Sequence, residues 1–405
     1  MDHPWLQRLR HIRQTGFSQV AFPGATHSRY VHSLGVMHLA GQAFDAAFRD
    51  WHFDRPEARE RMRACLRIAA LCHDLGHAPF SHCMEFTMPP VGELGLTWIR
   101  PDPARKATHE DYTIAILEHT ELRRAIEAHH GFTARHVASL IRPEIAVGDD
   151  FFVDHGLDHR RALSQIVSSE LDVDRMDYLP RDAFFTGAKY GSIDIHWLMS
   201  NLTTWVANGQ VNLALEGRAV YAFDHFLLAR HHMFLMVYFH HKSVVYEEVL
   251  RRYVASPDCT WRLPADLDAY LHSDDVAVVA HLREATNPWA RRLVEDQLYR
   301  RVLERHGNAH RADLSREAAQ LEEAGIDAIH STSTGRLSRY ASIGAKRQMA
   351  PEIFVLERTA DLPVERVRPQ SEASEVFARY AEERVIARLY VDEVDTERAR
   401  RIVAP

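Results

Sequence analysis

Residues 72–82 read CHDLGHAPFSH, a stretch of small, helix-ending sequence that packs three histidines into the ten residues from His73 to His82. The segment before it is expected to form a helix over Glu57–Leu75 that is closed by Gly76. His73 and Asp74 therefore stand at the end of this helix, and imidazole and carboxylate side chains are both ordinary metal ligands. A structural core does not need histidine at this density, so the stretch indicates a metal site. The alternative is a set of helix-end caps on a surface turn.

The two adjacent ligands need partners from other segments, because neighbouring residues of a helix point about 100° apart and cannot chelate one ion alone. His32 opens an earlier amphipathic helix and offers a second imidazole. Asp174 continues an apolar row over Leu163–Leu171 at helical spacing and is expected to face the core. A carboxylate buried there requires a cation, which is either a metal or an arginine such as Arg181. The mixed nitrogen and oxygen set suits a divalent ion with open positions for water and phosphate.

The composition fits a large helical protein with a small mixed lobe. The chain has 405 residues, 46% of them hydrophobic, which is enough for a large core. Apolar residues three and four apart predict mostly helices over the first 250 residues. From about Ser331 the pattern changes, and strands are expected at Glu352–Glu357 and Ala387–Val391 with a helix over Glu372–Arg384 between them. The predicted fold class is mainly α, a helical bundle with a small C-terminal α+β lobe.

Cap and turn signals place two further elements. Thr108 with Asp111 three residues later has the pattern of a capping box and predicts the start of a helix. Turn residues including Asn208-Gly209 flank the alternating run Val211–Leu215, which is expected to form a hairpin with Ala219–Phe223. A long helix is expected after the hairpin.

Charge and cysteine usage exclude several classes of protein. A formal net charge of −7 gives no general positive field for nucleic acid or an anionic membrane, although arginine clusters at 59–67 and 398–401 leave local contacts open. The longest apolar stretch, Phe223–Val245, is interrupted by Arg230, so we expect a buried helix there and no membrane span. Four cysteines without paired spacing and an N-terminus without a signal-peptide pattern indicate the reducing cytoplasm.

Five stretches, in order along the chain, carry a resemblance to a known family. They are QRLR at 7–10, FPGATHSRYVHSLG at 22–35, CHDLGHAPFSH at 72–82, THE at 108–110 and LDVDRMDY at 171–178. Together they resemble the HD-domain deoxynucleotide triphosphohydrolases, which include bacterial dGTPases and the vertebrate dNTPase that carries a sterile-alpha-motif domain. The resemblance covers residues 1 to about 250, and the C-terminal lobe is also similar. It implies an HD-type phosphohydrolase core at 1–255, a helical extension at 256–330 and the α+β lobe at 331–405.

The resemblance also implies a metal site and a reaction. His32, His73, Asp74 and Asp174 fall on the family's four ligands for one divalent metal ion. Two histidines and two carboxylates do not choose among Mg²⁺, Mn²⁺, Fe²⁺, Ni²⁺ and Zn²⁺. The implied reaction is hydrolysis of a deoxynucleoside triphosphate (dNTP) to deoxynucleoside and inorganic triphosphate, and the residues do not indicate which base is preferred.

Four further residues match family positions that contact the α-phosphate or move protons. They are His77, His82, Glu85 and His109. His82, assisted by Glu85 or His109, is placed to give a proton to the leaving 5′ oxygen. His109 stands in the first turn of a helix, where the helix dipole disfavours positive charge, so it is expected to be neutral. His77 has a second interpretation as a cap on the helix that ends at Gly76.

Eight residues are expected to contact the substrate. They are Gln14, Arg29, Arg175, Tyr178, Asp182, Arg230, Tyr238 and His241. The first five do so by resemblance: the glutamine at the sugar 3′-hydroxyl, the two arginines at phosphate, and the tyrosine and aspartate at the sugar end. The last three share one face of the long helix with Phe234, where a nucleotide could lie against an aromatic ring. Ordinary packing is the alternative for that row.

The resemblance implies a homo-oligomer, a dimer or tetramer, and leaves a nucleotide effector open. Asp2, Gln7 and Arg10 match the guanine-nucleotide activator site of regulated members, whose upstream residues are absent from this sequence. Two other functions stay open. One is an HD-superfamily phosphatase or phosphodiesterase that acts on nucleoside monophosphates or other phosphate esters. The other is a non-catalytic nucleotide sensor, against which the three histidines at 77, 82 and 109 argue.

Overall fold

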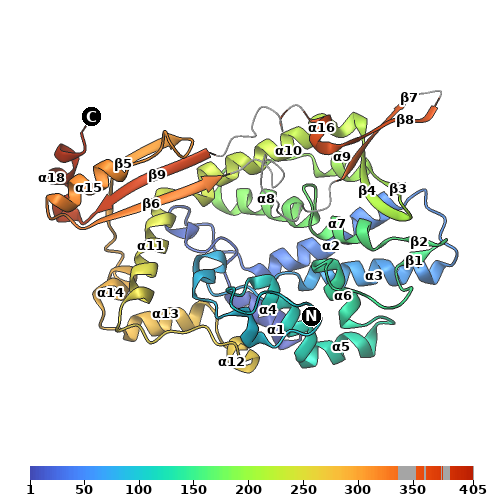
Figure 1. Cartoon of the computed structure of the whole chain (residues 1–405), viewed down its shortest axis with the longest axis horizontal. Coiled ribbons are helices and arrows are strands. Elements are labelled where there is room, and N and C mark those ends of the chain that lie inside the picture. Colours follow the sequence, from blue (N-terminus) through green and yellow to red (C-terminus); the bar gives the residue numbers. More distant parts are fainter. Residues whose placement is uncertain (336–352, 360–361, 375, 377–383, 405) are drawn as a thin grey trace.

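The structure, a computed structural model, describes residues 1–335, 353–359, 362–374, 376 and 384–404 (Figure 1). Helices dominate the chain up to α14 (Pro288–Val294), and strands gather in two small sheets. The predicted fold class, mainly α with a small C-terminal α+β lobe, is confirmed. Within the described residues, no helix is both long and apolar enough to span a membrane.

The helical body is built around α2 (Arg29–Ala47). This helix packs along α3 (Pro56–Cys72) and α8 (Val173–Thr186), and α3 in turn packs against α6 (Ala134–Ile141) and α7 (Arg160–Val167). Their apolar side chains share one core, because residues three and four apart lie on the same face of a helix. The start of α2, the end of α3 and the start of α8 meet at one place.

The end of α3 departs from the expectation. The helix stops at Cys72, and Gly76 does not close it with a left-handed cap. A Cβ at Gly76 would lie 2.0 Å from the carbonyl oxygen of His109 and 2.4 Å from the amide nitrogen of Thr113. Glycine is needed because the turn after α3 touches α4 (His109–His119). The predicted capping box at the start of α4 is confirmed.

The expected helical row over Leu163–Leu171 that continues to Asp174 is wrong, because two helices meet there. The first of them, α7, ends at Val167. The side chain of Asp172 then caps α8 by accepting a hydrogen bond from the amide of Arg175 at 2.9 Å. Asp174 therefore lies in the first turn of a new helix, where its side chain is 33% exposed and lines a cavity instead of facing the core.

One hairpin forms at the predicted turn, but with a different partner strand. β3 (Leu202–Ala207) pairs antiparallel with β4 (Gln210–Glu216). The Asn208-Gly209 turn between them has φ values of 52° and 73°, as a two-residue type I′ turn requires. The partner predicted at Ala219–Phe223 is wrong, because that segment leads into α10 (Val220–Met233).

The C-terminal lobe contains a three-stranded antiparallel sheet. Its order is β5 (Arg300–Gly307), β9 (Arg384–Val391), β6 (Ala328–Gly335), so β9 is the central strand. α15 (Ser315–Glu323) and α18 (Thr396–Ile402) complete a small apolar core around β9. Figure 1 shows this lobe beside α11 (His241–Ala255), at the opposite end of the molecule from β1 (Val153–Asp154) and β2 (Leu157–Asp158).

Two strand predictions in this part of the chain are confirmed. Ala387–Val391 lies within β9, and most of Glu352–Glu357 lies within β7 (Phe354–Thr359), which pairs with β4 and with β8 (Leu362–Pro369). The helix expected over Glu372–Arg384 lies largely outside the described residues, although its last residue already belongs to β9. β6 spans the boundary expected at 331, and β5, which lies before it, belongs to the same sheet. The predicted domain limits at 255 and 330 stay predictions.

The helix expected over Phe223–Val245 is interrupted. α10 runs into a π-helical turn at Phe234–Tyr238, the helix breaks, and α11 (His241–Ala255) starts anew. The remaining helices and strands are α1 (Pro4–Arg8), α5 (Glu121–His129), α9 (Ile195–Ser200), α12 (Leu267–Leu271), α13 (Asp275–Glu284), α16 (Gln370–Ala373), β1 (Val153–Asp154) and β2 (Leu157–Asp158).

Candidate active site

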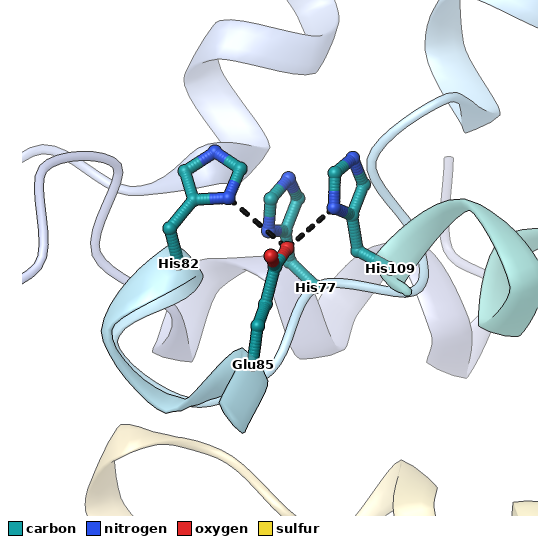
Figure 2. A group of neighbouring side chains, drawn as sticks. All are labelled: His77, His82, Glu85 and His109. Carbon is teal, nitrogen blue, oxygen red and sulfur yellow. Dashed lines mark hydrogen bonds and ion pairs between the residues drawn. The ribbon is translucent and has the colours of Figure 1, made fainter. Parts of the chain in front are cut away.

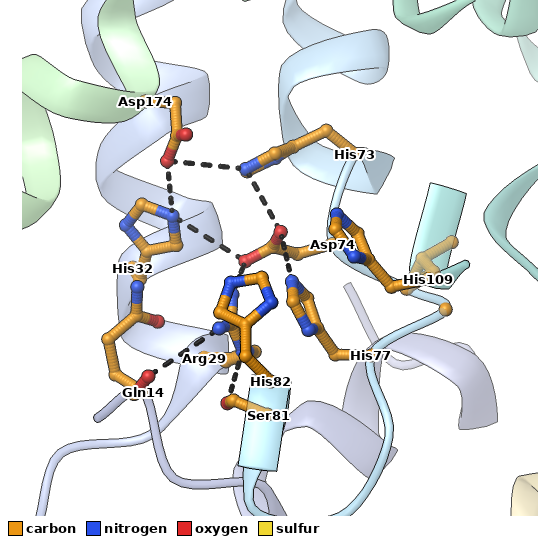
Figure 3. A network of polar contacts seen from close by, with 12 residues as sticks. Gln14, Arg29, His32, His73, Asp74, His77, Ser81, His82, His109 and Asp174 are labelled. Carbon is orange, nitrogen blue, oxygen red and sulfur yellow. Dashed lines mark hydrogen bonds and ion pairs between the residues drawn. The ribbon is translucent and has the colours of Figure 1, made fainter. Parts of the chain in front are cut away.

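Three helices bring the expected metal ligands together (Figure 3). His32 lies in the first turn of α2, His73 at the end of α3 and Asp174 in the first turn of α8. The Oδ1 of Asp174 is 3.0 Å from the Nε2 of His32 and 3.6 Å from the Nε2 of His73. One ligand atom from each residue lies within 4.8 Å of the other two, so these side chains could hold one ion.

The orientation of both imidazoles fits a metal. The Nδ1 of His32 lies 2.8 Å from an oxygen of Asp177, and the Nδ1 of His73 lies 2.8 Å from the carbonyl oxygen of Ala70. A carboxylate and a carbonyl only accept hydrogen bonds, so each Nδ1 carries a proton and each Nε2 faces the site, where a metal would replace any proton that it carries. Both Nε2 atoms are buried and face the carboxylate of Asp174 at 3.0 and 3.6 Å. A divalent cation between them would satisfy both.

Asp74, the fourth expected ligand, lies between these imidazoles and an arginine. Its Oδ1 is 3.3 Å from the Nε2 of His73, and its Oδ2 is 3.6 Å from the Nε2 of His32 and 2.5 Å from a guanidinium nitrogen of Arg29. Burial alone would raise the pKa of Asp74, but Arg29 and the surrounding histidines outweigh burial and hold it well below its usual range. Asp74 is therefore a carboxylate beside the ion site, with one oxygen shared with Arg29.

The charges around His32 also suit a cation. Burial lowers the pKa of His32, but the carboxylates of Asp174 and Asp177 outweigh burial and raise it to about 10. The same surroundings hold the pKa of Asp174 well below its usual value, in spite of burial. The arginine considered as the alternative partner of Asp174, Arg181, instead pairs with Asp177 at 2.7 Å. The carboxylates of the cluster thus favour positive charge beside His32 and Asp174, and Arg181 does not supply it.

A second cluster lies beside the first and consists of His77, His82, Glu85 and His109 (Figure 2). The Oε1 of Glu85 lies 3.0 Å from the Nδ1 of His82 and 2.5 Å from the Nδ1 of His109. The rings of His77 and His109 stack at 4.0 Å, and the Nε2 of His77 lies 3.1 Å from Asp74. Distances alone would admit an ion here too. Because one carboxylate oxygen already joins two imidazoles, the arrangement fits proton transfer better.

The pKa values of the two stacked histidines are shifted in opposite directions. Burial lowers the pKa of His109, but its hydrogen bond to Glu85 outweighs burial and raises the pKa overall. The raised pKa favours the charged form of His109, against the expectation of a neutral imidazole, because the Glu85 carboxylate opposes the effect of the helix dipole. Burial, the Arg29 guanidinium and His109 together hold the pKa of His77 well below its usual value. Of the two stacked rings, His109 is therefore the one that binds a proton more readily.

A cavity of about 590 Å³ opens over both clusters. Seven of the eight expected substrate residues line it: Gln14, Arg29, Arg175, Tyr178, Asp182, Arg230 and Tyr238. His241 is absent from the described lining residues, because the helix breaks after the π-helical turn and the expected row ends at Tyr238. The hydroxyl of Tyr238 donates to Asp182 at 2.7 Å, which ties the helical wall of the cavity to α8.

The cavity cations are already engaged. Arg29 donates from Nε to the hydroxyl of Ser81 at 2.7 Å as well as pairing with Asp74. Arg175 is buried and contacts Asp172 and the carbonyl oxygen of Ser169, which holds its guanidinium against the start of α8. An anion that binds either guanidinium would have to replace part of these contacts.

Sequence reasoning missed two residues that support the site. Asp177 orients His32, and its position three residues after Asp174 on one helix face was the available signal. His27 stacks on Phe185 and lies 2.7 Å from Asp182, so it holds that carboxylate in the cavity wall. His27 belongs to the second quoted motif, but no spacing pointed to its partner.

Comparisons with known proteins agree with the motifs. Residues 29–182 match the HD domain, and residues 193–332 match the HD associated region. An uncharacterized protein of Methanocaldococcus jannaschii is 27% identical over 303 residues, which are 75% of this chain and 55% of that protein. Human deoxynucleoside triphosphate triphosphohydrolase SAMHD1 is 34% identical over 202 residues, 46% of this chain and 30% of that protein.

The fold also has a solved counterpart. The crystal structure of a hypothetical protein from Aquifex aeolicus superimposes with a TM-score of 0.72 at 23% identity, covering 99% of this chain and 94% of the other. The chain spans about half the length of the first curated relatives it matches. On the two domain matches and the shared motifs, the chain belongs to the HD-domain family.

Proposed function

We propose that the chain is a metal-dependent phosphohydrolase that cleaves dNTPs to deoxynucleoside and inorganic triphosphate. One observation carries the proposal. Two buried imidazoles, both oriented through Nδ1, present free Nε2 atoms beside Asp174 at a cavity that also contains a histidine–glutamate cluster. The 34% identity to a human protein named as a dNTP triphosphohydrolase supports the substrate class.

The two clusters have different roles in the proposed reaction: one would hold the metal, and the other would donate a proton. His32, His73, Asp74 and Asp174 would hold a divalent metal, which when bound supplies Lewis acidity at the α-phosphate and an acidified water. Leaving of the 5′ oxygen requires a proton. A protonated histidine next to Glu85 stores that proton at the cavity, and His82 or His109 delivers it.

The cavity wall suits a nucleoside. A volume of about 590 Å³ lies within the roughly 300–1,000 Å³ range of small-molecule sites. Tyr178 and Tyr238 stand edge to face at 6.3 Å and offer an apolar surface to a sugar or base. Asp182, beside Tyr238, and Gln14 supply acceptors in the cavity lining. We extend the proposal to a homo-oligomer, on the family resemblance alone, and to the cytoplasm, on the unpaired cysteine spacing.

Product analysis tests the proposal. Purified protein is incubated with each dNTP and each candidate metal, and the products are separated by chromatography. We expect deoxynucleoside and inorganic triphosphate in equal amounts. Orthophosphate as the sole inorganic product would favour the phosphatase alternative, and binding without any product would favour the sensor.

Two variants control the assay. The His73→Ala, Asp74→Ala double variant should lose activity. His38→Ala removes an exposed histidine from the same helix as His32 and should leave activity unchanged. If the double variant hydrolyses dNTP as fast as the parent chain, the assignment of the metal site fails.

A further inference from the structure

A strained turn lies between two of the cluster histidines. Phe80 and Ser81 have φ values of 52° and 59°, and neither is glycine. A left-handed backbone is unfavourable for residues other than glycine, so the conformation persists only where surrounding contacts hold it. The turn separates His77 from His82, and its shape decides where both imidazoles point.

A buried carboxylate from a distant part of the chain contacts this turn. Asp275 is the first residue of α13, inside the region that matches the HD associated region. Its Oδ1 accepts a hydrogen bond from the amide of Phe80 at 2.6 Å, and its Oδ2 accepts one from the amide of Arg13 at 3.0 Å. Arg13 immediately precedes Gln14 of the cavity wall, so one carboxylate joins two edges of the site.

Neighbouring contacts hold the same segment from the same side. The guanidinium of Arg8 donates to the carbonyl oxygen of His77 at 2.9 Å and to that of Ser273 at 2.6 Å. The hydroxyl of Tyr270 in α12 donates to the carbonyl oxygen of Gly76 at 2.8 Å. Residues 270–275 thus contact the backbone between α3 and the turn at several points, and Asp275 makes the contact at the strained residue itself.

We propose that Asp275 is a positioning residue: by accepting hydrogen bonds from the backbone of Phe80 and Arg13, it holds the turn that aims His77 and His82 at the substrate. This role rests on the proposed function, because it acts through those histidines. It assigns the HD associated region a part in the reaction, since α13 supplies the carboxylate.

The carboxylate lies in a setting where its charge can be titrated. Asp275 is 5% exposed, and among the described residues no arginine, lysine or histidine forms an ion pair with it. The charged or titratable groups around it are Arg8, Arg13, Cys83 and Asp274. Burial raises the pKa of the Asp275 carboxyl to about 6, although its two backbone donors and Arg13 oppose the rise. Above about pH 6 the Asp275 carboxylate accepts both hydrogen bonds. Below about pH 6 one of its oxygens carries a proton, and that O–H faces a backbone N–H that also needs an acceptor.

The test replaces Asp275 with a neutral residue of the same shape. Asp275→Asn is compared with Asp268→Asn, which removes an exposed carboxylate from the neighbouring α12. Hydrogen–deuterium exchange mass spectrometry follows the peptide 76–84, and we expect faster exchange in Asp275→Asn only. If that variant does not fold, protection of the same peptide is followed in the parent chain, where it should fall below about pH 6.

Kinetics separate positioning from general stability. The ratio of kcat between the parent chain and Asp275→Asn should be roughly 10- to 100-fold at about pH 8 and should fall towards one below about pH 6, as Asp275 itself becomes neutral. KM should change little. Histidine titrations cancel in the ratio because both proteins contain them.

Three results would overturn the inference: a ratio that stays constant with pH, unchanged exchange of the peptide, or an equal effect in Asp268→Asn. Exchange needs no turnover, so it decides the positioning role even if the chain hydrolyses no nucleotide. If the exchange effect is seen but the parent chain hydrolyses no nucleotide, the proposed function is contradicted, and the hold of Asp275 on the turn at Phe80 stands.

Discussion

Replacing Asp177 with asparagine should weaken metal binding without removing a ligand. The Asp177 carboxylate receives the Nδ1 proton of His32 at 2.8 Å and pairs with Arg181 at 2.7 Å. Asparagine keeps one acceptor oxygen for these two partners and loses the negative charge that makes the imidazole a stronger ligand. His32 would then present its Nε2 less firmly to the ion.

The expected size follows from that contact. Removing a residue that orients a metal-bound histidine typically costs 10- to 100-fold in metal affinity, which is about 1.4–2.7 kcal/mol. Asp177 supports one of two histidine ligands, while the Nδ1 of His73 stays fixed by the carbonyl of Ala70. We therefore expect a loss near the lower end, about tenfold in the dissociation constant for Mn²⁺.

Isothermal titration calorimetry with Mn²⁺ measures this effect in the metal-free chain. Asp149→Asn is the matched control, because Asp149 lies 3.0 Å from the Nε2 of His136 in a similar pair outside the cavity. The control should bind Mn²⁺ as the parent chain does. A dissociation constant for Asp177→Asn within twofold of the parent value would refute the argument that Asp177 prepares His32 for a metal.

Three further outcomes are expected. Glu85→Gln should lower the pKa of His109, because the Glu85 carboxylate is what raises it. The alkaline limb of the plot of kcat against pH should therefore move to lower pH. A limb that does not move would contradict the pairing of Glu85 with His109. Gly76→Ala should destabilise the fold by about 1–3 kcal/mol and so lower the melting temperature, because its Cβ would meet the backbone of α4. Gly131→Ala should leave the melting temperature unchanged, because a Cβ at Gly131 meets no described atom within 4 Å. Equal effects of the two substitutions would contradict the close approach of Gly76 to α4. The affinity for Mn²⁺ should rise by up to about tenfold per pH unit, because the metal must displace the proton of His32, whose pKa is raised to about 10. An affinity that does not change with pH would contradict this exchange of a proton for the metal.

Local rules predicted the parts of the site that depend on neighbouring residues. The helix leading to His73 and the capping box that places His109 follow from short-range patterns, and the structure has both. The position of Asp174 beside two imidazoles was also expected. The reason expected for that position was wrong. Asp172 caps the start of a new helix, and the Asp174 carboxylate therefore faces the cavity and not the core.

Long-range contacts decided what the sequence could not predict. The role of Gly76 depends on the backbone of α4, and the raised pKa of His109 depends on Glu85, 24 residues away. The break after Tyr238 removed His241 from the expected row. Asp275 lies 195 residues from its partner Phe80, so no spacing rule could connect them.

The most direct test of the metal site is anomalous diffraction from crystals soaked in Mn²⁺. We expect one strong peak about 2.0–2.3 Å from the Nε2 atoms of His32 and His73 and from an oxygen of Asp174. A peak within the cluster of His77, His82, Glu85 and His109, or none beside Asp174, would contradict it.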